Sequence, residues 1–137
     1  MKTEYKIISD IIDKSSRVLD VGCDDGALME YLKQNKDVDI RGIEISKEKV
    51  QTCISKGLTV LEGNAELDLK QFPNKSFDYV VLGQTLQAFI NPEIVIKELL
   101  RVGKKAIVTI ALFPTLKSSF ITISGFTKAC KVCPSTT

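Results

Sequence analysis

The sequence predicts an α/β fold: a Rossmann-like, doubly wound, mostly parallel sheet in a three-layer α/β/α arrangement. Short apolar runs alternate with segments whose apolar residues recur at helical spacing, which is the pattern of right-handed βαβ units. Residues 77–82 form an almost continuous apolar run, typical of a parallel strand buried on both faces. The first apolar run, residues 17–21, leads directly into a glycine-containing turn and a helix-like stretch, as in the first unit of an open α/β sheet.

Local patterns place the elements in order along the chain. Short apolar runs predict strands at residues 17–21, 40–45, 58–61, 77–82 and 106–110. Apolar residues spaced three and four apart predict helices at residues 4–13, at 27–34, between Ser46 and Gly57, and between Asn91 and Gly103. Ser46 and Asn91 are the predicted N-caps of the last two helices, and residues 67–75 are expected to be a loop or short turn.

The composition indicates a globular protein and excludes several kinds of function. The 137 residues carry a net charge of +2, which is too small to predict binding to nucleic acid or to an anionic membrane. No apolar run is long enough to span a membrane and the N-terminus lacks a signal-peptide core, so we expect a cytoplasmic protein. Histidine is absent, which excludes Ser-His-Asp and Cys-His catalysis. Cys130 and Cys133 have metal-ligand spacing, but a single such pair without histidine predicts no metal site.

The turn after the first strand is the strongest functional signal in the chain. Asp20 lies near the strand end, and Gly22 and Gly26 let the backbone turn tightly and approach a ligand, beside the unpaired N–H groups of a helix start. Asp24 stands where the dinucleotide fingerprint has its middle glycine. Because Asp tolerates a positive φ, we expect the turn to form nevertheless. The alternative interpretation of this segment is a βα turn that binds no ligand.

Further polar residues follow the next strands, at the same predicted edge of the sheet. Glu44, near the end of the second strand, could accept hydrogen bonds from both hydroxyls of a ribose. Asn64 and Ala65 follow the third strand, where a side-chain amide and a backbone N–H could bind the edge of an adenine ring. Gln84 follows the fourth strand and is expected over the same crevice. Each of these residues could instead be a solvated group at a strand end or in a polar loop.

The charge of this crevice bears on the choice of ligand. Asp20 could accept a hydrogen bond from an ammonium group, directly or through water, and Asp24 and Asp25 add negative charge beside it. This arrangement favours a cationic ligand and disfavours a pyrophosphate. S-adenosylmethionine carries a positive sulfonium and a positive ammonium group, so it ranks above NAD-type dinucleotides as the expected cofactor.

These motifs resemble those of a known family. Asp20, Gly22, Gly26 and Glu44, with the sequence Gly-Asn-Ala at 63–65 and Phe-Asp-Tyr-Val at 77–80, resemble the class I S-adenosylmethionine-dependent methyltransferases. More narrowly, the stretches 16–23, 42–45, 76–87 and 99–103 resemble the methionine-biosynthesis protein MetW family, over roughly residues 5–110.

The resemblance implies a domain that binds S-adenosylmethionine and acts in methionine biosynthesis beside a homoserine O-acyltransferase, as its partner or activator. It implies that Asp20, Gly22 and Gly26 hold the methionine end of the cofactor, Glu44 the ribose, and Asn64 with Ala65 the adenine. The predicted cofactor-binding residues are Asp20, Gly22, Cys23, Asp24, Gly26, Glu44, Ile45, Asn64, Ala65 and Gln84.

The chain departs from the family pattern at three places. Asp24 replaces a glycine, which predicts reduced affinity for the cofactor, and Asn64 stands where an acid is commoner. The pattern ends near Ile110, so we divide the chain into a methyltransferase-like domain, 1–110, and an atypical tail, 111–137. The fold is then expected to lack the normal C-terminal strand pair and to expose the edge of its fifth strand. Residues 119–124 alternate enough to form a strand, with fraying expected beyond, and the tail is expected to reflect a truncation or a shifted reading frame.

Three interpretations of function follow. The first is a methyltransferase, in which positioning of a strong nucleophile beside the sulfonium supplies most of the catalysis. No residue that activates a methyl acceptor can be named, which favours the second interpretation, a non-catalytic module that binds the cofactor and modulates a partner enzyme. The third is an α/β domain that binds nothing.

Overall fold

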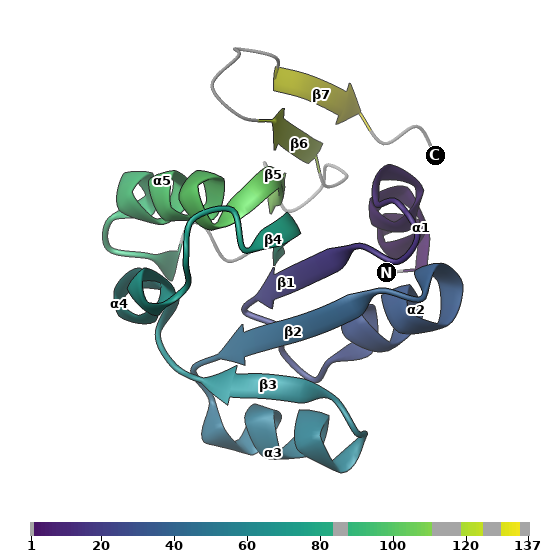
Figure 1. Cartoon of the computed structure of the whole chain (residues 1–137), viewed down its shortest axis with the longest axis vertical. Helices are drawn as coiled ribbons and strands as arrows, with labels where there is room; N and C mark the ends of the chain where they lie inside the picture. The colour runs from purple at the N-terminus through teal and green to yellow at the C-terminus, as the bar shows by residue number, and fades with distance from the viewer. Residues whose placement is uncertain (1, 84–87, 111–118, 125–129, 135–137) are drawn as a thin grey trace.

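The computed structural model describes residues 2–83, 88–110, 119–124 and 130–134. They contain one seven-stranded sheet in the order β3-β2-β1-β4-β5-β6-β7 (Figure 1). Neighbouring strands from β3 to β5 run parallel, and β6 and β7 add to the sheet antiparallel. The strands are β1 (Arg17–Val21), β2 (Asp39–Glu44), β3 (Thr59–Glu62), β4 (Phe77–Gly83), β5 (Gly103–Ile110), β6 (Ser119–Ser124) and β7 (Cys130–Pro134).

Helices cover both faces of the parallel part of the sheet, which gives the predicted three layers. They are α1 (Lys2–Ile11), α2 (Ala27–Lys36), α3 (Lys47–Ser55), α4 (Ala65–Asp68), the 3-10 helix η1 (Leu69–Gln71) and α5 (Pro92–Val102). Figure 1 shows α1 and α2 on one side of the sheet and α4 and α5 on the other. The α/β fold class, its doubly wound arrangement and its parallel strands are therefore confirmed.

Two apolar clusters hold the layers together because successive residues of a buried strand point to opposite faces. Val18 and Tyr79 pack with residues of α1, α2 and α3 in one cluster. Leu19 and Val80 pack with residues of α4, η1 and α5 in the other. Both clusters include residues of β1 and β4, which lie side by side in the sheet. Because these strands and β2 run parallel, their carboxyl ends lie at one edge of the sheet.

Two local predictions need correction. Residues 65–71 form α4 and η1, although residues 67–75 were expected to be a loop or short turn. Asn91 occupies the N-cap position of α5 as predicted, but its side chain makes no capping hydrogen bond. The Glu66 carboxylate instead accepts hydrogen bonds from the backbone N–H groups of Ile90, at 2.9 Å, and Asn91, at 3.2 Å. Glu66 therefore holds the segment that leads into α5, although it does not cap the first turn of that helix.

The expectation that β5 would remain an open edge is wrong. β6, at the predicted residues 119–124, pairs antiparallel with β5, and β7 pairs antiparallel with β6. Fraying beyond Ser124 is likewise contradicted at β7. An uncovered edge strand leaves a row of unpaired backbone donors and acceptors, and this C-terminal strand pair supplies partners to β5.

Candidate functional site

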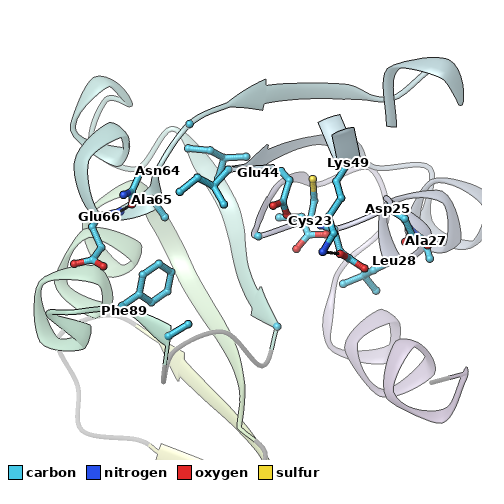
Figure 2. A pocket seen from close by; sticks show the side chains of 18 of the residues that line it. Cys23, Asp25, Ala27, Leu28, Glu44, Lys49, Asn64, Ala65, Glu66 and Phe89 are labelled. Atoms are coloured by element: carbon cyan, nitrogen blue, oxygen red, sulfur yellow. Dashed lines mark hydrogen bonds and ion pairs between the residues drawn. The ribbon is translucent and has the colours of Figure 1, made fainter. Parts of the chain in front are cut away.

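A cavity of about 620 Å³ lies at the carboxyl ends of β1, β2 and β4. Its walls come from the turn after β1, the turn after β2, the segment between β3 and α4, and the first helix. Figure 2 shows Cys23, Glu44 and Lys49 on one side of the cavity and Asn64, Glu66 and Phe89 on the other. Segments far apart in the sequence thus converge on one space, as expected for the carboxyl edge of a parallel sheet.

The cavity brings together most of the residues predicted from the sequence. Those that line it are Asp20, Gly22, Cys23, Asp24, Glu44, Ile45, Asn64 and Ala65. Gly26 lies behind the lining, where it precedes α2, and Gln84 lies outside the described residues. The predicted juxtaposition of Asp20, Glu44 and Asn64 is therefore observed.

Left-handed backbone conformations shape the turn between β1 and α2. Gly22, Asp24 and Gly26 have φ values of 70°, 55° and 83°. Asp24 thus adopts the positive φ expected of it, and its presence leaves the turn intact. Gly26 also has a steric role: a Cβ atom there would collide with Cδ1 of Leu58 and lie 3.1 Å from Sγ of Cys53. Only glycine lets the start of α2 pack this closely against α3 and the segment before β3.

Glu44 connects the two turns at the carboxyl edge. Its side chain is only 8% exposed. Oε2 accepts a hydrogen bond from the backbone N–H of Asp24 at 2.9 Å, and Oε1 accepts one from the backbone N–H of Ser46 at 3.0 Å. Each carboxylate oxygen can accept a second hydrogen bond, so the group retains acceptors for a pair of hydroxyls in the cavity.

Asp20 is the most deeply buried acid of the cavity, at 3% exposure. Burial raises the pKa of its carboxyl to about 7, with smaller contributions from the negative charges of Glu44 and Asp24. Within the described part of the chain, no hydrogen-bond donor or cation contacts this carboxyl. A buried acid without a partner is costly in its charged form, and a cationic ligand would supply the missing partner.

Asp24 is paired with a residue that the sequence analysis missed. The Nζ of Lys49, on α3, forms an ion pair with Oδ1 of Asp24, marked by the dashed line in Figure 2. The hydrogen bond from Lys49 is the main cause that lowers the pKa of Asp24. The backbone of Asp24 is held as well, since its carbonyl accepts a hydrogen bond from Sγ of Cys53 at 3.2 Å.

Asn64 has a structural duty besides lining the cavity. Its Oδ1 accepts a hydrogen bond from the backbone N–H of Glu66 at 2.9 Å and so caps α4. Its own backbone N–H donates to Oδ2 of Asp68 at 2.6 Å. Because the Glu66 N–H occupies Oδ1, the orientation of the Asn64 side-chain amide is fixed, and its NH₂ is the group that remains for a ligand.

Some lining residues were missed for identifiable reasons. Lys49 follows Ser46 by three positions, so it belongs to the first turn of α3 and faces the cavity only because α3 packs beside β2. Tyr5 lies on the helical spacing of apolar residues in α1, which predicts only a contact with the core; it makes that contact and also lines the cavity. Glu66 and Phe89 could not be placed because nothing local links α4 to the start of α5.

The described lining of the cavity offers acidic side chains and one lysine, but no reactive thiolate and no metal-binding cluster. Burial chiefly raises the pKa of the Cys23 thiol, so this lining cysteine is not a reactive thiolate. Among the described residues, no cluster of His, Cys, Asp or Glu is suited to hold a metal ion. No helix in that part of the chain has the length and apolar character needed to cross a membrane.

Comparison with protein families identifies the chain. The family model of the methionine biosynthesis protein MetW matches residues 2–136. The chain belongs to the MetW family. The match continues well past Ile110, where we expected the family pattern to end, so the C-terminal residues belong to the pattern too.

A curated relative resembles the chain in sequence, and two solved structures resemble it in fold. The chain is 29% identical, over 94% of its length, to the bifunctional methionine biosynthesis protein MetXA/MetW of Rhodopirellula baltica, and it spans 22% of that protein. A SAM-dependent methyltransferase from Thermotoga maritima superposes with a TM-score of 0.65 at 24% identity, over 80% of this chain and 50% of the other. The [4+2]-cyclase SpnF superposes with a TM-score of 0.70 at 24% identity, over 78% of this chain and 43% of the other. At these identities the structural likeness establishes the methyltransferase-like Rossmann fold alone.

Proposed function

We propose that this MetW-family protein binds S-adenosylmethionine in the cavity at the carboxyl edge of its sheet. The observation that carries the proposal is the convergence of Asp20 and Glu44 on the Gly22–Gly26 turn, inside one cavity. A ribose would bind to the carboxylate of Glu44, which keeps free acceptor sites while backbone donors hold it in place. The fold of the structural neighbours supports the choice of cofactor, since one of them is a SAM-dependent methyltransferase.

The remaining residues would contact the methionine end and the adenine of the ligand. Asp20, Gly22, Cys23 and Asp24 surround the methionine end, and Asp20 offers its buried carboxyl to the positive charges there, the sulfonium as well as the ammonium. Ile45, Asn64 and Ala65 lie where the adenine would bind, with the Asn64 side-chain NH₂ as donor. S-adenosylmethionine bound there would supply an electrophilic methyl group, and the residues of this chain would position it and exclude water.

We propose further that the protein acts in methionine biosynthesis as a partner of a homoserine O-acyltransferase. The relative from Rhodopirellula baltica unites a MetXA part and a MetW part in one polypeptide. Joining two domains in one chain raises their effective concentration, which is useful when the two act on each other.

The two buried free thiols, Cys23 and Cys53, fit a reducing compartment, and we therefore propose that the protein acts in the cytoplasm.

A second candidate function is a non-catalytic module that binds the cofactor and adjusts the activity of the acyltransferase. It is favoured by the lining of the cavity, in which the described residues offer no histidine and a cysteine whose raised pKa keeps it protonated. Methyl transfer from labelled S-adenosylmethionine to extracts containing homoserine-pathway intermediates separates the two functions. Labelled product identifies an enzyme, whereas binding without product, together with co-purification of the acyltransferase, identifies the module.

Calorimetric titration with S-adenosylmethionine tests the shared part of both functions. The wild type should bind the ligand, and Glu44→Ala should bind it at least tenfold more weakly, because loss of an acceptor for a ribose hydroxyl costs about 1.5 kcal/mol or more. Glu48→Ala is the matched control, since this acid lies in the first turn of α3 and outside the cavity lining. Equal affinity of wild type and Glu44→Ala, with both variants folded by circular dichroism, would refute the assigned ribose site.

A further inference from the structure

The charges that line the cavity are very unevenly distributed. Among the described lining residues, the acids outnumber the single basic side chain, that of Lys49. The acids come from α1, from β1 and its turn, from β2 and from α4, so they surround the cavity from several sides. They are Glu4, Asp20, Asp24, Asp25, Glu44 and Glu66.

Most of these acids already have partners within the protein. Glu44 and Glu66 accept hydrogen bonds from backbone N–H groups, and Asp25 accepts one from the backbone N–H of Ala27 at 3.0 Å. Asp24 is paired with Lys49. Asp20 differs from all of them: it is 3% exposed, it faces the cavity, and no donor of the described chain contacts its carboxyl.

The cation at the rim does little to neutralise this field. The Lys49 side chain is 52% exposed and its ammonium is held by Asp24, so the pair as a whole is neutral and its field is screened by water. The interior of the cavity is therefore anionic at its buried end, next to Asp20. A ligand gains most there from a positive charge close to the strand ends, where solvent screening is weakest.

On the basis of the proposed function, we propose that the cavity selects the sulfonium form of its adenosyl ligand, S-adenosylmethionine, over the neutral thioether S-adenosylhomocysteine. The two ligands share the adenosine, the ammonium and the carboxylate. They differ only by one methyl group and by the positive charge on sulfur. A domain with this preference responds to the level of the methyl donor and readily releases the demethylated product, which suits a sensor of methionine-pathway supply.

Calorimetry with three ligands tests the preference. S-adenosylmethionine and sinefungin, in which a protonated amine replaces the sulfonium methyl, should each bind about tenfold more tightly than S-adenosylhomocysteine at low salt. An added positive charge that shifts the pKa of a nearby carboxyl by about one unit interacts with it by about 1.4 kcal/mol, which corresponds to about tenfold in affinity. The preference should shrink in about 1 M salt, where the Debye length falls to about 3 Å. Sinefungin separates charge from the methyl group, since it supplies only the charge.

Variants locate the source of the preference. Asp20→Asn keeps the shape of the side chain and should reduce the ratio to less than about threefold, because the unpartnered carboxyl is gone. Lys49→Gln and Asp24→Asn form a matched pair, because the first removes the positive charge of the exposed ion pair and the second removes its negative charge. Lys49→Gln should raise the ratio of the affinity for S-adenosylmethionine to that for S-adenosylhomocysteine, and Asp24→Asn should lower this ratio, each by about twofold.

The outcomes distinguish this inference from the function on which it depends. If S-adenosylhomocysteine binds as tightly as S-adenosylmethionine, or if the ratio is unchanged in Asp20→Asn, the cavity still binds adenosyl ligands but the charge selection is refuted. If sinefungin follows S-adenosylhomocysteine, the methyl group and not the charge is recognised, which also overturns the inference. If none of the three ligands binds to the wild type, the proposed function and the inference fail together.

Discussion

The affinity of the cavity for S-adenosylmethionine should depend steeply on pH through Asp20. The pKa of this carboxyl is about 7, raised first by burial and then by Glu44 and Asp24. Its ionised form attracts the cationic ligand and its protonated form does not. The pKa of Asp24 is lowered by Lys49, so that acid stays ionised over the whole range of the experiment.

The size of the effect follows from the ionised fraction of Asp20. With a pKa of about 7, roughly 3% of the carboxyl is ionised at about pH 5.5 and roughly 76% at about pH 7.5. The affinity should therefore rise about 25-fold between these two values if only the ionised form binds. Measurements are kept below about pH 7.5, because the α-amino group of the ligand loses its proton near pH 8.

Isothermal titration over this pH range measures the effect directly. Asp20→Asn should bind weakly and with an affinity that hardly changes with pH. Titrations of the wild type in two buffers of different ionisation enthalpy should also reveal proton release on binding. A wild-type affinity that is flat with pH, or a slope that persists in Asp20→Asn, would refute the assignment of Asp20 to the positive end of the ligand.

Three predictions concern stability. The folded-state pKa of Asp20, about 7, lies above its unfolded value of 3.8, so its contribution to stability is fully present below pH 3.8 and is lost as the pH rises through about 7. Asp20→Asn should therefore raise the free energy of unfolding at pH 8 by up to about 4 kcal/mol in urea titrations. An unchanged or lowered free energy of unfolding would contradict this. Gly26→Ala should lower it by about 3 kcal/mol, from the positive φ and the contact with Leu58, and a loss below about 1 kcal/mol would show that this close approach is dispensable. Arg101→Ala should lower the free energy of unfolding by about 2 kcal/mol, because the guanidinium donates to the carbonyls of Phe72 and Leu69 and so holds η1 against α5. Lys104→Ala is the control: it breaks only an exposed ion pair and should change the free energy of unfolding by less than about 0.5 kcal/mol. Equal effects of the two substitutions would argue against this role of Arg101.

The sequence predicted the backbone of the site because strand phase and chain order determine which residues share an edge. Asp20 and Glu44 end neighbouring parallel strands, and their convergence needs no knowledge of side-chain packing. Asp24 could be predicted to keep the turn intact from its tolerance of positive φ alone. Asn64 was placed correctly but its role as the N-cap of α4 was missed, since the short helix after it was taken for a loop.

Other features depend on contacts that no local pattern reveals. Lys49 reaches Asp24 only because α3 packs beside the turn after β1. Glu66 acts on Ile90 and Asn91, more than twenty positions away in the chain. β7 is short and ends in a proline, so its sequence alone does not predict a strand, yet it pairs with β6 and covers the edge of that strand.

The central claim is that S-adenosylmethionine binds in this cavity with its ribose on Glu44 and its positive end toward Asp20. A crystal structure of the protein grown with the ligand tests this most directly. The account predicts electron density in the cavity, with the ribose hydroxyls within hydrogen-bond distance of the Glu44 carboxylate and the ammonium or sulfonium group beside Asp20. Ligand density elsewhere on the molecule, or within the cavity but in the reverse orientation, would contradict it.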